Sequence, residues 1–192
     1  MTAIIQYNAG NILSVANALE RLGERYVVTD DPVEIQKADR VLFPGVGEAG
    51  SAMQYLKAKG LDLLIPRLEQ PVLGICLGMQ LMCTHSREGN TQGMGIFDTI
   101  VSKFPPKGLV PHMGWNNITA LSSNLFTGIS DTDDVYFVHS YYASLCHETI
   151  ATTDYIVPFS AALEQKNFYA LQFHPEKSGK TGSKILENFI NL

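Results

Sequence analysis

Residues 71–80 read Pro-Val-Leu-Gly-Ile-Cys-Leu-Gly-Met-Gln, and this stretch decides the fold. The apolar run before Cys76 predicts a short buried strand, and the residues after it predict a helix that begins at once. With Gly74 two residues before the cysteine and Gly78 two residues after it, the pattern is G-x-C-x-G, a nucleophile elbow. In such a turn the helix N-terminus favours a thiolate, and the amide of Leu77 is free to bind a developing oxyanion. A buried structural cysteine is the alternative that this stretch alone leaves open.

The composition indicates one globular domain spanning residues 1–192, with 45% hydrophobic and 17% charged residues. A net charge of −5 argues against nucleic acid or an anionic membrane as the main partner. The sequence contains no apolar run of the ~18 residues that a membrane-spanning helix needs. The start of the chain has no basic segment typical of a signal peptide. Three cysteines without a framework spacing suit a reducing compartment, so we expect a cytoplasmic protein.

Apolar strands and amphipathic helices alternate before the elbow. Strands are expected at 3–5, 26–28 and 40–43, and helices at 12–22, 30–38 and 49–58, with a further helical stretch to residue 68. This alternation predicts an α/β fold with a mostly parallel sheet flanked by helices. In such a sheet, the loops at the carboxyl ends of the strands build the site.

From about residue 96 the predicted segments are short and interrupted by Pro and Gly, which indicates an added, smaller antiparallel section. A strand is expected at 135–138, and the strands 159–163 and 169–173 flank a tight connection. A helix at 181–192 closes the chain. Cys83 is expected on the elbow helix, packed against the core.

The sequence Gln-Phe-His-Pro-Glu at 172–176 offers the base that a cysteine hydrolase needs. His174 and Glu176 would point to opposite faces of a regular strand. Because Pro175 forces the chain off the strand, the carboxylate can fold back onto Nδ1 of the histidine and fix its tautomer. Taken alone, the segment is more often a surface turn.

A second oxyanion donor is expected across the cleft, in the turn Pro-Gly-Val-Gly at 44–47. Gly45 and Gly47 would let the amide of Val46 turn toward the oxyanion and let a substrate approach the backbone. Gln80 lies four residues after the nucleophile, on the same helix face, where its amide could contact a polar substrate.

Together, G-I-C-L-G-M-Q, P-G-V-G and Q-F-H-P-E-K-S resemble the class I (triad) glutamine amidotransferases over nearly the whole chain. The resemblance implies that the substrate is glutamine and that no cofactor is used. It assigns Cys76 as nucleophile, His174 as base and acid, and Glu176 as the orienting carboxylate. It also places Ser140 and Tyr141, in His-Ser-Tyr at 139–141, beside bound glutamine.

Within that family, the segments at 10–15, 111–116 and 176–178 are similar to the glutaminase subunits of imidazole glycerol phosphate synthases, which serve histidine biosynthesis. The resemblance implies a heterodimer with a separate cyclase, a (β/α)8 barrel that receives the ammonia. The residues expected at this interface are Asn11, Pro111, His112, Met113, Gly114, Trp115, Asn116 and Lys177. One departure is Gln-Tyr-Asn at 6–8, where the family commonly has an acidic residue before the tyrosine.

Other functions remain open at this point. An amidotransferase for anthranilate or pyridoxal phosphate synthesis would share the triad, but the segment 111–116 speaks against it. A peptidase or γ-glutamyl hydrolase would use the same elbow and base as an isolated chain, and a silent binding module would need no triad. The five histidines have no metal-ligand spacing, so no metal is expected. The turn at 45–47 lacks the lysine of a mononucleotide site.

Overall fold

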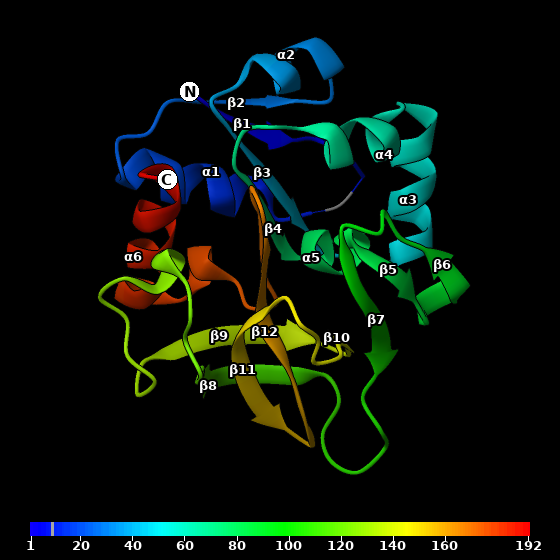
Figure 1. Cartoon of the computed structure of the whole chain (residues 1–192), viewed down its shortest axis with the longest axis vertical. Coiled ribbons are helices and arrows are strands. Elements are labelled where there is room, and N and C mark those ends of the chain that lie inside the picture. Colours follow the sequence, from blue (N-terminus) through cyan, green and yellow to red (C-terminus); the bar gives the residue numbers. More distant parts are fainter. Residues whose placement is uncertain (9) are drawn as a thin grey trace.

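A seven-stranded sheet with the order β11-β12-β13-β4-β3-β1-β2 forms the centre of the computed structural model, which describes residues 1–8 and 10–192 (Figure 1). Five neighbouring strands are parallel: β2 (Tyr26–Thr29), β1 (Thr2–Ile5), β3 (Arg40–Gly45), β4 (Val72–Cys76) and β13 (Phe168–Leu171). Two strands continue the sheet in antiparallel fashion: β12 (Val157–Gln165) and β11 (Thr149–Tyr155). The mostly parallel sheet predicted from the sequence is confirmed.

Helices cover both faces of this sheet, as the alternation of strands and helices requires. On one face lie α1 (Ile12–Arg21) and α6 (Gly179–Ile190), and on the other lie α2 (Pro32–Lys37), α3 (Ala49–Ala58) and α4 (Leu61–Leu64) (Figure 1). Successive strand residues point to opposite faces. In β1, Ile4 packs in the core under α1 and α6, whereas Ala3 and Ile5 pack in the core under α2 and α3. The short α5 (Leu77–Met82) follows β4 directly.

Two smaller sheets form the predicted second section; in Figure 1 the strands β5 and β6 lie beside α5, and β8 and β9 lie below α6. The first has the order β10-β7-β5-β6, built from β10 (Tyr141–Ala143), β7 (Phe97–Lys103), β5 (Cys83–Ser86) and β6 (Thr91–Gln92). The second is the antiparallel pair β8 (His112–Asn117) and β9 (Asp134–His139). The section is not purely antiparallel, because β5 and β7 pair in parallel. Short 3₁₀ turns connect the elements: η1 (Ile65–Arg67), η2 (Glu88–Asn90), η3 (Asn124–Phe126) and η4 (Pro175–Lys177).

Two local expectations differ from the structure. The elbow helix ends at Met82, so Cys83 is the first residue of β5 and does not lie on the helix. Its backbone carbonyl accepts from Gly95 in a neighbouring segment, so packing between elements overrides the helical pattern. The closing helix begins at Gly179, two residues before the expected start.

In the part of the chain that the structure describes, no helix is long and apolar enough to cross a membrane.

Candidate active site

Cys76 stands at the corner between β4 and α5 with φ 54° and ψ −104°, a backbone conformation that a non-glycine residue rarely adopts. The two flanking glycines make the corner possible. A Cβ at Gly78 would overlap the carbonyl of Phe43, and a Cβ at Gly74 would lie 2.9 Å from the amide of Met79. The nucleophile elbow predicted from G-x-C-x-G is therefore present, with each glycine required by a close backbone approach.

His174 and Glu176 form a buried pair where β13 ends. Oε1 of Glu176 lies 2.7 Å from Nδ1 of His174, and both side chains are fully buried. The turn η4, which begins at Pro175, folds the carboxylate back, as the sequence predicted. Ser178 fixes the backbone of this turn by donating its hydroxyl to the carbonyl of His174 at 2.6 Å. The carboxylate therefore favours a proton on Nδ1 and orients the imidazole.

The other ring nitrogen of His174 is left for chemistry. Nε2 is buried and has no hydrogen-bond partner among the described residues. Burial alone lowers the pKa of His174, but charge on Cys76, together with Glu176, outweighs burial and raises that pKa to about 10. The site thus supports an imidazolium beside the cysteine, and a positive charge in that place activates a cysteine nucleophile.

Gln172 links Cys76 to Gln80 through hydrogen bonds, a role that the sequence analysis missed. Its Nε2 donates to Sγ of Cys76 at 3.7 Å, and its Oε1 accepts from Nε2 of Gln80 at 3.0 Å. Gln80 Nε2 also donates to the carbonyl of Tyr141 at 2.9 Å. Both amide hydrogens of Gln80 are therefore used within the protein, so its carbonyl oxygen is the end that remains for a ligand.

Asn11 contacts the triad from the loop before α1. Its Nδ2 donates to Oε1 of Glu176 and lies 3.3 Å from Nδ1 of His174. The residue adopts a left-handed conformation with φ 79°, which asparagine tolerates better than most residues. Asn11, which the sequence analysis assigned to a partner interface, is half-buried, and its side chain contacts the carboxylate of Glu176.

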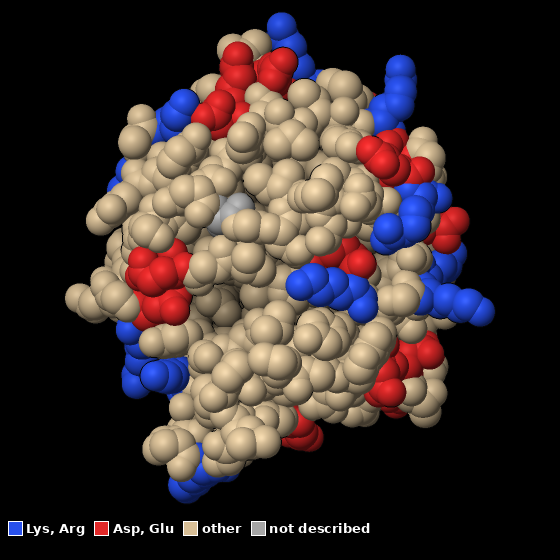
Figure 2. All heavy atoms as spheres, turned by 180° about the vertical axis from the view of Figure 1, so that it is seen from behind, with Lys and Arg blue, Asp and Glu red and all other residues tan. Residues whose placement is uncertain are grey.

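A cavity of ≈ 240 Å³ opens in front of Cys76. The residues that line it are Val46, Gly47, Cys76, Leu77, Gln80, Glu88, Pro111, Val138, His139, Ser140 and Tyr141. It thus brings together the nucleophile, the expected oxyanion donors and most of the expected substrate-binding residues. Figure 2 shows a hollow near the middle of the rear face of the molecule, with charged side chains standing apart around it.

Gly45 does not line this cavity, although it was expected to contact substrate. A Cβ at Gly45 would overlap the hydroxyl of Tyr7, so the glycine makes room for that ring. The Tyr7 hydroxyl is buried and has no hydrogen-bond partner in the described structure. Burial, and then charge on Cys76, raises the pKa of Tyr7 well above its usual value, so the phenol stays protonated.

Glu88, in η2, was also missed from the sequence, where no local pattern marks it. Among the described residues that line the cavity it is the one with an acidic side chain. Its Oε2 accepts from the amide of Ala49 at 2.9 Å, which fixes the carboxylate at the N-terminus of α3. Burial raises the pKa of Glu88.

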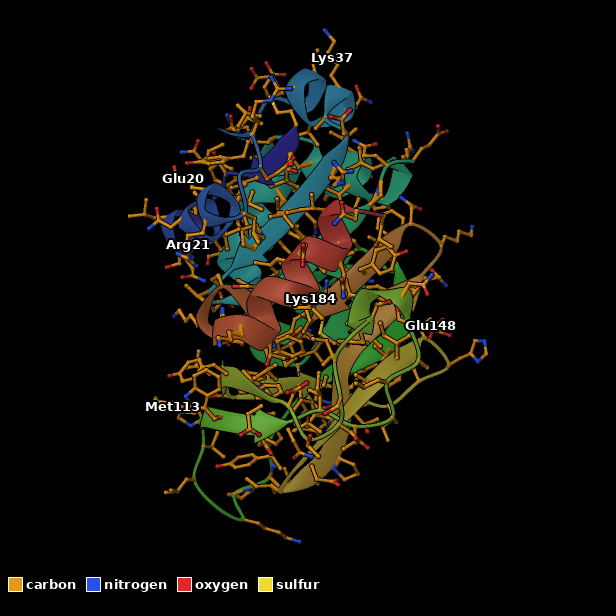
Figure 3. All side chains as sticks on the ribbon, turned by 90° about the vertical axis from the view of Figure 1, so that its left-hand side faces the viewer. Glu20, Arg21, Lys37, Met113, Glu148 and Lys184 are labelled. Atoms are coloured by element: carbon orange, nitrogen blue, oxygen red, sulfur yellow. The ribbon has the colours of Figure 1, made fainter. Side chains whose placement is uncertain are left out.

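The β8 residues that were expected at a partner interface alternate between exposed and buried or half-buried positions along the strand. Met113 and Trp115 of β8 are 63% and 57% exposed, and Figure 3 shows Met113 projecting from the same side of the molecule as Glu20 and Arg21 of α1. Lys177 and Pro111 are also exposed, and Pro111 lines the cavity. Gly114 and Asn116 are half-buried. His112 is only 3% exposed, so its expected place on the surface is wrong. Because it alternates with Met113 along the strand, it faces the core.

The described part of the chain has no cluster of three or more His, Cys, Asp or Glu side chains that could hold a metal ion. All three cysteines are free thiols. The chemistry that this site supports with its own residues is attack by a cysteine on a small polar substrate.

Residues 3–192 match the family described as "Glutamine amidotransferase class-I". The subunit HisH of imidazole glycerol phosphate synthase from Bacteroides thetaiotaomicron is 58% identical over 99% of this chain and 98% of its own length. The corresponding subunit from Yersinia pseudotuberculosis is 46% identical over 98% of each chain. The crystal structure of a putative GMP synthase protein from Thermoplasma acidophilum has a TM-score of 0.76 at 23% identity, covering 100% of this chain and 92% of the other, which supports the fold alone.

Proposed function

The chain belongs to the class-I glutamine amidotransferase family, and we propose that it is the glutaminase subunit of an imidazole glycerol phosphate synthase. It hydrolyses glutamine to glutamate and ammonia, and the ammonia passes to a cyclase in histidine biosynthesis. The observation that carries this proposal is the position of Cys76. It stands at a strained elbow in a cavity, with the Gln172 amide on its sulfur and the His174–Glu176 pair beside it.

The reaction proceeds in two halves. Sγ of Cys76 attacks the side-chain carboxamide carbon of glutamine, and His174 gives the proton on Nε2 to the departing ammonia. A γ-glutamyl thioester remains on the cysteine. Water then attacks the thioester while His174 takes its proton, and glutamate leaves as the thiolate is restored. Glu176 holds the imidazolium during both halves.

Two backbone amides would stabilise the oxyanion that forms in each half. The Leu77 amide follows the nucleophile at the start of α5, and Val46 lies across the same cavity. Gly47 follows with φ 132°, a conformation that favours glycine. The carbonyl of Val46 accepts from the amide of Gly10 at 3.3 Å, so the first loop holds this turn.

The polar groups of the cavity suit the two ends of glutamine. The Glu88 carboxylate would pair with the α-ammonium group, and the free carbonyl oxygen of Gln80 would accept a hydrogen bond from the substrate. The backbone at Ser140 and Tyr141, which also line the cavity, would bind the α-carboxylate.

The partner in this proposal is a separate cyclase of (β/α)8-barrel fold, bound as a heterodimer, and the lyase step belongs to it. Free ammonia would be protonated in water and lost as a nucleophile, so docking must be direct. Pro111, Met113, Trp115 and Lys177 offer exposed apolar and basic groups, and Pro111 also lines the cavity. Large exposed aromatic side chains are common anchors in interfaces. The free cysteines suit the reducing cytoplasm in which we place this complex.

The experiment that tests the proposal is glutaminase activity of the purified chain, alone and with the cyclase plus its nucleotide ligand. The Gly-Val-Gly turn at 45–47 can hold its peptide in either orientation, so we expect the Val46 donor to be missing from the oxyanion site until the cyclase docks. One missing oxyanion donor costs on the order of 10²–10³ in turnover, so we expect very low activity alone and a rise of at least about 10²-fold in the loaded complex. Full activity of the isolated chain would favour an independent thiol hydrolase. The Cys76→Ala variant, assayed in parallel, measures the background.

A further inference from the structure

A line of side-chain hydrogen bonds leads from β8 to the wall of the cavity. Nδ2 of Asn116 lies 3.4 Å from Nε2 of His112, and Nδ1 of His112 lies 3.1 Å from Nε2 of His139. Nδ1 of His139 lies 2.8 Å from the backbone carbonyl of Tyr141. The mechanism above uses neither histidine.

The chemistry at the two ends of this line fixes every proton within it. The amide nitrogen of Asn116 can only donate, so Nε2 of His112 accepts and its ring proton is on Nδ1. That proton points to Nε2 of His139, so His139 also carries its proton on Nδ1. It donates this proton to the Tyr141 carbonyl, which can only accept. Both rings therefore need to be neutral and in the same tautomer.

The surroundings of the two rings favour the neutral form and prevent them from turning. Burial lowers the pKa of His139 to about 3 and that of His112 to about 4. His112 stacks between Tyr155, with ring centres 3.9 Å apart, and Phe137, with ring centres 4.7 Å apart. His139 packs against Phe159 at 5.2 Å. A ring held in this way keeps its two nitrogens aimed at their partners.

The two ends of the line have functional neighbours. At one end, the Tyr141 carbonyl accepts from both His139 and Gln80, which fixes the peptide group beside the cavity. At the other end, His112 lies on β8 next to Met113, which points outward (Figure 3). Because His112 and Met113 are adjacent residues of β8, a displacement of this strand by a molecule docked on its exposed side chains would carry His112 with it.

We propose that His112 and His139 are positioning residues that hold the Ser140–Tyr141 wall of the cavity and transmit docking at Met113 and Trp115 to that wall. This inference rests on the proposed function for the identity of the ligand and the partner. The histidines act through the Tyr141 carbonyl and do not touch the reacting atoms.

The first test needs neither partner nor activity. Nitrogen-15 NMR of histidine side chains in the native chain distinguishes the two neutral tautomers from the charged ring. We expect two histidines that stay neutral with the proton on Nδ1 from pH 8 down to pH 5.5. A proton on Nε2 of either ring, or titration of either ring in this range, would overturn the proposal even if the glutaminase assignment is correct.

The second test uses variants of His112 in the complex with the cyclase. His112→Phe keeps a flat ring between Tyr155 and Phe137 but removes both nitrogens, whereas His112→Asn keeps a donor near the place of Nδ1. We expect His112→Phe to raise the KM for glutamine about tenfold with a smaller change in kcat, since one hydrogen bond is worth about a factor of ten at most. His112→Asn should recover most of the loss. An unchanged KM in His112→Phe, or equal losses in both variants, would contradict the positioning role.

The third test measures whether docking of the cyclase is transmitted through His112 to the glutamine site. In a Cys76→Ala background, which prevents turnover, the Kd for glutamine is measured with and without the cyclase. We expect docking to tighten glutamine binding, and His112→Phe to bring the ratio of the two Kd values close to one. Because coupling between two ligands is mutual, glutamine should tighten cyclase binding by the same factor, and His112→Phe should remove that effect too.

His147→Phe, at an exposed histidine between β10 and β11, is the matched control and should keep the ratio of the two Kd values. A ratio that survives His112→Phe would overturn transmission, whereas glutamine that fails to bind the chain at all would count against the proposed function itself.

Discussion

Nδ1 of His174 lies 2.7 Å from Oε1 of Glu176, although only one residue separates them in the chain. The turn η4 makes this possible at the point where β13 ends. Asn11 donates to the same carboxylate oxygen from a loop 165 residues away. The other oxygen, Oε2, is buried without a partner in the described structure, so the carboxylate is held through Oε1 alone. This geometry lets Glu176 fix the orientation of the His174 imidazole, the group that we propose as the base.

We expect Glu176→Gln to lower kcat by on the order of 10²–10⁴, because an amide cannot stabilise the imidazolium as a carboxylate does. The fold should be retained, since the side chain keeps its size. Losses in a His174→Ala, Glu176→Gln double variant should be far from additive, because the two residues act as a unit. Steady-state kinetics of the four proteins checks this, and additive losses would mean that Glu176 acts elsewhere.

Asn11 provides a second test of the same carboxylate. Asn11→Gly keeps the left-handed backbone but removes the amide, and we expect about a tenfold to hundredfold loss in kcat, the range for a hydrogen bond to a charged group. Asn11→Asp keeps the shape of the side chain but places a second carboxylate against that of Glu176, so the loss in kcat should be larger. If both variants changed only the affinity for the cyclase and left kcat intact, Asn11 would be an interface residue and not a support of the triad.

The buried histidines predict how stability depends on pH. The pKa values of His139 and His112 are lowered on folding, so the unfolded chain binds more protons below pH 6.5 and stability falls as pH falls. For His139 alone the free energy of unfolding should drop by about 2 kcal/mol between pH 7 and pH 5. The pKa of His174 is raised to about 10, so its contribution is complete below pH 6.5 and is lost as pH rises toward 10.

Urea unfolding from pH 5 to pH 9.5 measures both slopes, with a maximum expected near pH 6.5. Cys76→Ala removes the main charge that raises the pKa of His174 and should flatten the alkaline slope only. His112→Phe should reduce the acidic slope only. A stability curve with no fall on the acidic side would show that these rings are accessible to protons in the folded chain.

Trp115 is the residue whose removal should weaken assembly most. It is 57% exposed on β8 and packs edge-on against Tyr136 at 6.0 Å, so the ring is held in place before docking. We expect Trp115→Ala to raise the Kd for the cyclase about 30-fold, the effect of losing an interface anchor worth about 2 kcal/mol. Leu63→Ala, at a 64% exposed leucine on α4, is the control and should leave the Kd unchanged. Equal effects of the two substitutions, measured by titration calorimetry, would remove Trp115 from the interface.

The sequence alone was sufficient for the parts of the site that local geometry determines. The elbow follows from two glycines that must touch the backbone or side chains of Phe43, Met79 and Met82. The His174–Glu176 contact follows from the proline between them. The parallel sheet follows from apolar strands that alternate with amphipathic helices.

The supporting residues could not be predicted in this way, because their partners are far along the chain. Gln172 reaches Cys76 across 96 residues, and Asn11 reaches Glu176 across 165 residues. No local period marks such contacts. His112 shows a second limit: the segment 111–116 was assigned to a surface as a whole, whereas strand alternation sends its side chains to opposite faces.

The most direct test of the central claim is to supply the two nitrogen sources separately to the complex of the Cys76→Ala chain with the cyclase. Formation of imidazole glycerol phosphate is measured with glutamine and, in parallel, with an ammonium salt. We predict that synthesis from glutamine is abolished while synthesis from ammonium continues at the rate of the wild-type complex. Glutamine-dependent synthesis that survives Cys76→Ala would contradict the assignment of this cysteine as the nucleophile.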